Sequence, residues 1–325
     1  MKKRILLVSA AALMLAANVS AQDVTPAKFK FQELSLGEYM IDGFGKGANP
    51  EGIVLTDPGT VVCGLGPASA NAAAFDEEGF NKMKTAIETG TSIVNSEFGH
   101  LLMIKGKDSK ETEGNSATES LNTKFWNMAF VGPESTSFKD KKYRATIQMK
   151  LVTDMEASET VVLKFAYVTS QNVGINEREV IYRGDKGWFQ AQIEGTIGTT
   201  GATRCRVSFP GGLMDQSALY IYEVRFEAGA TTELVNSPND GTPGMDKPYG
   251  AAAVGLDQLT GNSSFVTWDN TAIYVNNAIS QNVEVYNIGG QLVYSAVADK
   301  NLMEISMAKG VYVVKVGSKS TKVVL

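Results

Sequence analysis

The chain has 325 residues, of which 43% are hydrophobic and 20% are charged, and its formal net charge is −5. The length fits two domains, and the composition is typical of a globular protein that buries a core. The negative charge argues against binding to nucleic acid or to anionic membranes.

The first 21 residues have the features of a secretory signal peptide. A basic start (residues 2–4) precedes an apolar run, and the small-x-small sequence at 19–21 predicts cleavage before Gln22. The apolar run is too short for a membrane span, and no cysteine follows it to carry a lipid. Cleavage would remove three positive charges and no negative ones, which takes the net charge from −5 to −8. We expect an exported protein, extracellular or on the outer cell surface, with the periplasm as the alternative.

Residues 22–228 are predicted to form a domain made almost entirely of β-strands. Only 74–90 has the apolar spacing of a short amphipathic helix. From 98 onward, alternating runs between polar turns indicate eight or so strands, which favour a two-layer antiparallel sandwich of the jelly-roll type. The predicted strands are 98–106, 123–132, 142–152, 159–169, 177–184, 188–195, 204–212 and 218–229.

The rest of the chain divides into an irregular segment and a second region of strands. Residues 229–270 are rich in Gly, Pro, Asn and Ser and have no sustained period, so they are predicted to be a linker or an irregular segment. Residues 271–325 again consist of short strands. The predicted fold class is therefore all-β: a jelly-roll β-sandwich followed by a small C-terminal β-sandwich.

The strand at 188–195 carries a tryptophan among polar side chains. Trp188, Gln190 and Gln192 share the face that is predicted to be polar. An indole can stack on the CH face of a sugar while neighbouring amides bond its hydroxyls, so these residues form a candidate glycan site. Gln148 and Lys150 join it if their strand lies beside this one. Alternatively, the N-terminal segment, a loop or the second domain covers Trp188. The side chains predicted to point inward are Phe189, Ala191 and Ile193.

Catalytic and metal-binding patterns are weak. The one histidine, His100, is in phase with apolar neighbours on its strand and is expected to be structural. Two cysteines, Cys63 and Cys205, are too few to build a His/Cys metal site with it. Cys205 shares a strand face with apolar residues, which favours buried thiols over a disulfide. A glycosidase would need two carboxylates across a cleft, which the sequence does not place. We expect no enzyme activity and no cofactor.

The central region resembles the galactose-binding-like jelly roll of carbohydrate-binding modules. The resemblance lies in the order of "GWFQAQIEG", "VSFPGG" and "LYIYEVRFEAG" over about 130 residues. It implies non-catalytic recognition of a glycan or polysaccharide. Many such modules hold a structural calcium, and the resemblance leaves that site open; Tyr222-Glu223 stands where the family often has two acids, which weakens the case for it.

The tail resembles the C-terminal sorting domain that Bacteroidetes attach to proteins of type IX secretion. The matching residues are "VYNIGGQLV" at 285–293, Ile305-Ser306, "GVYVVKV" at 310–316 and "KVVL" at 322–325. The resemblance implies secretion machinery as a partner; the alternative is a plain β-domain without a sorting role.

Together these features predict an exported carbohydrate-binding protein that has no membrane span and does not bind nucleic acid. The alternative function is that of a structural or adhesive surface protein without a sugar site.

Overall fold

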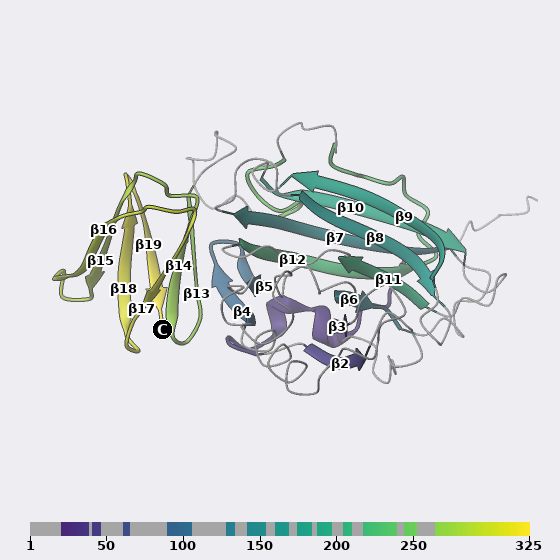
Figure 1. Cartoon of the computed structure of the whole chain (residues 1–325), viewed down its shortest axis with the longest axis horizontal. Helices are drawn as coiled ribbons and strands as arrows, with labels where there is room; N and C mark the ends of the chain where they lie inside the picture. The colour runs from purple at the N-terminus through teal and green to yellow at the C-terminus, as the bar shows by residue number, and fades with distance from the viewer. Residues whose placement is uncertain are drawn as a thin grey trace, which may run out of the picture.

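The computed structural model describes residues 21–38, 41–46, 61–65, 90–105, 128–133, 142–153, 160–168, 174–183, 187–196, 204–209, 217–238, 244–251 and 264–325. The described part is nearly all strand, with two short 3₁₀ helices near the N-terminus, so the predicted all-β class is confirmed (Figure 1). No described helix is long and apolar enough to cross a membrane. Residues 1–20 of the predicted signal peptide and all but the last residue of the predicted helix at 74–90 lie outside the described residues.

Strands β5 to β12 form a jelly roll. One sheet has the order β10-β7-β12-β5, and the other has the order β6-β11-β8-β9. Except between β8 and β9, each connection crosses from one sheet to the other, which is the double Greek key of a jelly roll. These strands are β5 (Gly99–Lys105), β6 (Met128–Val131), β7 (Lys142–Thr153), β8 (Thr160–Val168), β9 (Gly174–Arg183), β10 (Phe189–Thr196), β11 (Arg204–Phe209) and β12 (Ser217–Ala228).

Four shorter strands extend the two sheets. The first sheet gains β4 (Thr91–Ser96) beside β5, and β1 (Gln22–Asp23) pairs with the end of β12. The second sheet continues beyond β6 with β3 (Val61–Leu65) and β2 (Ile41–Lys46), which are parallel to each other.

The main core lies between the two layers. Alternation along β10 directs Phe189, Ala191 and Ile193 into it, so the predicted inward face of this strand is confirmed. Opposite them, Phe130 of β6 and Val207 of β11 come from the second sheet.

Two 3₁₀ helices, η1 (Ala27–Phe29) and η2 (Phe31–Glu33), close one side of this core. The ring of Phe29 meets that of Phe130 edge to face at 5.4 Å between centroids. His100 is held by a hydrogen bond between its Nδ1 and the carbonyl oxygen of Leu34, at 2.8 Å. This contact fits the structural role predicted for the histidine.

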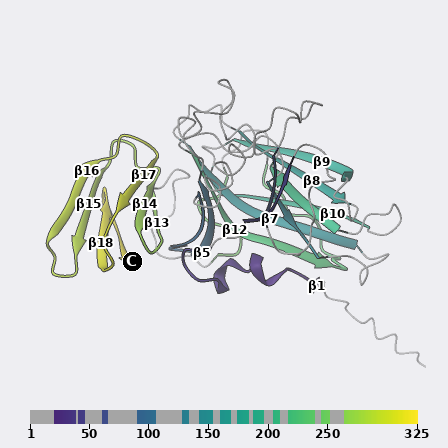
Figure 2. The same cartoon turned by 60° about the horizontal axis from the view of Figure 1, so that its bottom comes forward.

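The C-terminal sandwich is joined to the jelly roll through a shared sheet. Strands β13, β14 and β17 continue the first sheet beyond β4, and the other four strands form a second sheet with the order β16-β15-β18-β19 (Figures 1 and 2). The core between these sheets includes Trp268 and Val285. The strands are β13 (Phe265–Trp268), β14 (Ala272–Asn276), β15 (Asn282–Asn287), β16 (Leu292–Val297), β17 (Leu302–Ser306), β18 (Val311–Val316) and β19 (Lys319–Val324).

The sequence predicts a linker or an irregular segment at 229–270, and the structure describes parts of it: 230–238 and 244–251 are irregular, but they pack against Trp188 and β10, and the end of the segment is a strand. Residues 265–268 form β13, whose Trp268 pairs with Asn95 of β4. Met245 forms an isolated bridge with Trp188, and Ser237 bonds the backbone of Gln190. A composition rich in Gly and Pro predicts the absence of a regular period, but it does not predict the absence of packing.

The strand order also separates the two cysteines. Cys63 lies in β3 and Cys205 in β11, and β6 runs between these strands. Strands two places apart are roughly 9–10 Å from each other, whereas a disulfide requires Cα atoms within about 7 Å. We expect thiol titration of the unfolded, non-reduced protein to find two thiols per chain. A titration that finds none would contradict this strand order.

Candidate functional site

The structure brings the predicted glycan-site residues together on one sheet face. Strand β10 pairs with β7 so that Gln190 lies opposite Gln148 and Gln192 lies opposite Thr146. Phe189 pairs with Met149, which places Trp188 and Lys150 side by side at the end of the ladder. The sequence could not establish this neighbourhood, because register is set by contacts between distant segments.

Trp188 is not on an exposed face, which corrects the expectation from the sequence. Only 1% of its surface is exposed. Its backbone N–H donates to Met245 O, and Met245 N–H donates to Trp188 O, both at 2.8 Å. The ring of Phe98 meets the indole edge to face, with 5.9 Å between centroids. A loop and a neighbouring hairpin therefore cover the ring, which leaves no free face for a sugar.

The covering loop approaches the strand so closely that a glycine must precede Trp188. Gly187 has a φ of +88°, in the region that favours glycine. A Cβ added there would lie 2.8 Å from Met245 O, which is closer than real contacts allow. The close contact between the loop and Trp188 therefore depends on the glycine at position 187.

A second segment, residues 230–238, covers the middle of the same face; we call it the strap. Gln190 Nε2 donates to Val235 O at 2.8 Å, and Gln192 Oε1 accepts from Val235 N–H at 2.7 Å. Arg144, on β7, donates to Thr232 Oγ1 at 2.8 Å. The strap thus uses the hydrogen-bonding groups of this face that a sugar would need.

Gln148 and Lys150 are also buried. Gln148 Nε2 donates to Glu223 Oε2 at 3.0 Å. Lys150 is 4% exposed, and its Nζ lies 4.5 Å from the ring centroid of Phe265. Burial lowers the pKa of Lys150 to about 8, although the charges of Glu97 and Asp246 oppose the shift. The predicted residues are therefore neighbours on a covered face and do not form an open groove.

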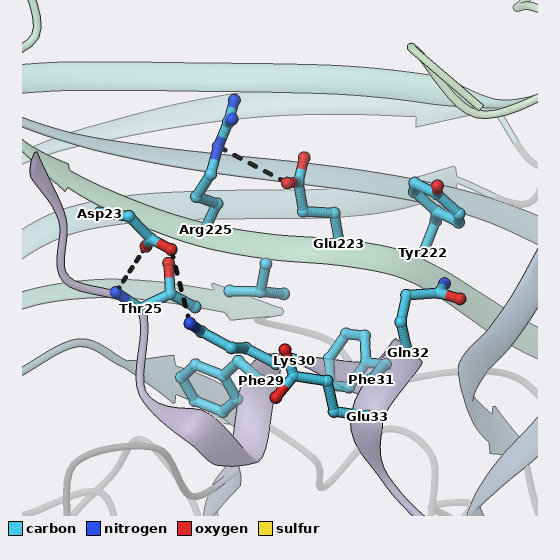
Figure 3. A pocket seen from close by; sticks show the side chains of 11 residues that line it. Asp23, Thr25, Phe29, Lys30, Phe31, Gln32, Glu33, Tyr222, Glu223 and Arg225 are labelled. Atoms are coloured by element: carbon cyan, nitrogen blue, oxygen red, sulfur yellow. Dashed lines mark hydrogen bonds and ion pairs between the residues drawn. The ribbon is translucent and has the colours of Figure 1, made fainter. Parts of the chain in front are cut away.

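A pocket opens elsewhere, where β12 has no neighbouring strand on one side. Strand β5 pairs with β12 as far as Ile221, and β1 pairs with it from Glu227 onward. Between these points β12 faces the N-terminal segment, and a bulge at Tyr222 shifts its register against β7. The volume of this β12 pocket is about 290 Å³ (Figure 3). Its lining residues are Asp23, Thr25, Phe29, Lys30, Phe31, Gln32, Glu33, Tyr222, Glu223, Val224 and Arg225.

The N-terminal wall of the β12 pocket is an ordered set of polar groups over buried rings. Asp23 accepts a hydrogen bond from Thr25 N–H at 2.9 Å and lies 3.7 Å from Lys30 Nζ. Burial raises the pKa of Asp23, but the Thr25 hydrogen bonds and the Lys30 charge outweigh burial and hold it below its usual value. The buried rings beneath are Phe29 and Phe31.

The β12 wall adds a carboxylate, a guanidinium and an aromatic ring. Arg225 Nε lies 3.5 Å from Glu223 Oε1 and 3.6 Å from Glu227 Oε2. Burial raises the pKa of Glu223, and the Arg225 charge and the Gln148 hydrogen bond only partly offset this effect. Burial and the charge of Glu223 also raise the pKa of Tyr222.

This arrangement suits a small polar ligand. The pocket offers hydrogen-bond donors and acceptors and a partly buried aromatic ring, the usual make-up of small-ligand sites. Among the described residues, no group of three or more His, Cys, Asp or Glu side chains is placed to hold a metal.

The sequence did not predict the β12 pocket. Tyr222 and Glu223 were noted only as a departure from a family pattern. A bulge opposite an unpaired strand edge leaves no sequence signal that could have located the pocket.

The chain was compared with protein families, curated proteins and solved structures. Residues 253–325 match a family model described as a domain of unknown function, DUF6383. No curated protein matches the chain.

Similar solved structures include an enzyme and carbohydrate-binding modules. An arabinose-bound MgGH51 α-L-arabinofuranosidase has a TM-score of 0.30 and 11% identity over 65% of this chain, which spans only 32% of the enzyme. The family 16 carbohydrate binding module-2 has a TM-score of 0.26 and 11% identity, covering 42% of this chain and 84% of the module. The CBM22-1 xylan-binding domain from Paenibacillus barcinonensis Xyn10C has a TM-score of 0.27 and 14% identity, covering 44% of this chain and 84% of the domain.

Proposed function

We propose that this is an exported, non-catalytic carbohydrate-binding protein that holds a sugar residue of a glycan in the β12 pocket. The observation that carries the proposal is the composition of that pocket, which combines the Tyr222 ring with polar side chains at a gap in the sheet. The sequence resemblance of the central region to galactose-binding-like modules supports the same function.

The polar groups of the pocket fit hydroxyl groups. Glu223 and Glu33 offer carboxylate oxygens that accept hydrogen bonds. The Gln32 amide bonds both main-chain groups of His100, which leaves its second N–H and its second lone pair for a ligand. A sugar ring that packs on Tyr222 would present its hydroxyls to these side chains.

The charges favour a sugar without a negative charge. Lys30 lies beside Asp23, and Arg225 lies between Glu223 and Glu227, so both cations of the pocket already have carboxylate neighbours. A uronic acid or sulfated sugar would compete with these carboxylates and meet repulsion from them. Neutral and amino sugars avoid this cost.

The second candidate function is that of a structural or adhesive surface protein. The observation in its favour is the burial of Trp188 and its neighbours, because the sugar platform expected from the sequence is covered. If the β12 pocket binds no sugar, this alternative becomes the better account.

The route out of the cell rests on two features of the sequence. Export would follow from the predicted signal peptide. Passage through a type IX exporter would follow from the resemblance of residues 285–325 to a sorting domain.

Replacing Tyr222 with alanine should weaken glycan binding about 5- to 150-fold, the equivalent of about 1–3 kcal/mol for a lost aromatic contact. The measurement is binding to an array of neutral, amino and acidic sugars, followed by calorimetry with the best ligand. Tyr249→Ala is the matched control, because Tyr249 is an exposed tyrosine outside the pocket. Equal loss in both variants, no loss in either, or a preference for acidic sugars would contradict the proposal.

A further inference from the structure

Strand β16 is an exposed edge of the C-terminal sandwich. It is the terminal strand of the sheet β16-β15-β18-β19, and both views place it on the side away from the jelly roll (Figures 1 and 2). Its sequence, "LVYSAV", contains no charge and no proline. Val293 is 43% exposed and Val297 is 62% exposed. Natural edge strands are usually protected from pairing by charges, proline or a β-bulge; β16 has no charge and no proline, and its register shift lies at Val293, near the start of the strand.

The opposite edge of the same sheet is protected. Strand β19 is the other terminal strand, and it contains Lys319 and Lys322. Two copies of β19 brought together would place lysines close to each other, whereas two copies of β16 bring no charges together. The charge pattern therefore favours self-association through β16 over β19.

The backbone of β16 has hydrogen-bonding groups that point away from the sheet. Ala298 N–H donates to Gln281 O, and Ala298 O accepts from Ser280 N–H, so both groups of Ala298 face the neighbouring chain segment. Peptide groups alternate in direction along a strand, so those of Val297 and Ser295 point to the free edge.

The side chains of β16 alternate in the same way. Tyr294 and Ala296 pack against the C-terminal core, so Ser295 and Val297 lie on the outer face of the sheet. Antiparallel pairing about a two-fold axis at Ser295 would place the two Ser295 residues opposite each other and Val297 of each copy beside the bulge at Val293 of the other. This register satisfies the free peptide groups of Ser295 and brings the exposed Val297 of each copy close to the second copy.

We propose that two copies of this chain associate through antiparallel pairing of their β16 strands, centred on Ser295. The pairing would extend the four-stranded sheet across both copies. The contact is isologous, because the same strand serves both partners, and it closes at two copies. A contact of this size gives a weak dimer that dissociates in the micromolar range.

Sedimentation velocity of the full chain across micromolar concentrations tests the dimer. We expect a concentration-dependent shift from monomer to dimer, and Val297→Lys should raise the dissociation constant by about tenfold or more. Val324→Lys is the matched control, because it adds the same charge to an exposed valine on the β19 edge. It should leave the equilibrium unchanged. A wild-type chain that stays monomeric, or a Val297→Lys variant that dimerises equally well, would overturn the proposal.

A cross-link distinguishes self-pairing from binding of another partner to the same edge. Two cysteines at the two-fold centre lie within disulfide reach, so Ser295→Cys should form covalent dimers under mild oxidation. Ser320→Cys, on the β19 edge, should form them no faster than the wild-type chain. Failure of Ser295→Cys to cross-link would show that a second copy does not occupy this edge.

Discussion

Replacing Trp188 with alanine should lower the free energy of unfolding by about 3–5 kcal/mol, the usual cost of deleting a buried aromatic ring. The indole is fully buried and packs with Phe98 and Met245 in a cluster of side chains on the outer side of the first sheet. Its removal would leave a cavity that the bridged loop cannot fill without losing its backbone hydrogen bonds. Urea denaturation measures the change.

Phe189→Ala is the internal standard for this result. Phe189 lies next to Trp188 but points into the main core, so both variants should lose similar stability. If Trp188→Ala costs less than about 1 kcal/mol while Phe189→Ala costs several, the loop at Met245 does not cover the indole in solution. The sugar platform on β10 would then be open again.

Replacing Lys150 with methionine should raise the free energy of unfolding by about 3 kcal/mol at pH 7. Burial lowers the pKa of this lysine from 10.5 to about 8, so holding it charged in the folded state costs free energy. Below pH 8 the lysine is protonated in both the folded and the unfolded state, and the whole cost is present. Methionine has a similar shape and carries no charge, so it removes that cost.

The pH dependence identifies the cause. Between pH 8 and pH 10.5 the folded state loses the Lys150 proton while the unfolded state keeps it. The unfolded state then binds more protons, so the stability contributed by this site rises with pH. The gap between wild type and Lys150→Met should therefore close over this window in chemical denaturation series. A variant that is less stable at pH 7 would show that Glu97, Asp246 and the Phe265 ring compensate the buried charge.

Alternation along single strands predicted much of the fold. The inward phase of Phe189, Ala191 and Ile193 follows from period-two patterning, and the number of such runs was enough to favour a jelly roll. These features are local, because each depends on neighbouring residues in one strand.

The exposure of the opposite face was not predictable in this way. Alternation assigns Trp188 and Gln190 to one side of the sheet, but what covers that side comes from segments more than 40 residues away. The strap binds Gln190 through the Val235 carbonyl, the Ser237 N–H and the Ser237 hydroxyl, and these contacts leave no periodic pattern in the sequence. The polar pattern therefore predicted a solvent-exposed face, but in the fold the strap covers this face and forms hydrogen bonds with it.

The β12 pocket depends on features that only the three-dimensional arrangement reveals. It needs the register shift at Tyr222, the end of β5 pairing at Ile221 and the return of the N-terminal segment to β12. Asp23 and Lys30 lie about 200 residues from Tyr222 in sequence, and no spacing rule connects them.

A crystal structure of the protein with its best array ligand would test the central claim most directly. We expect density for a sugar in the β12 pocket, with its ring on Tyr222 and its hydroxyls within hydrogen-bonding distance of Glu223 or Gln32. The strap and the loop at Met245 should stay in place over Gln190 and Trp188. A sugar bound instead against Trp188, Gln190 and Gln192, with the strap displaced, would contradict the assignment of the site.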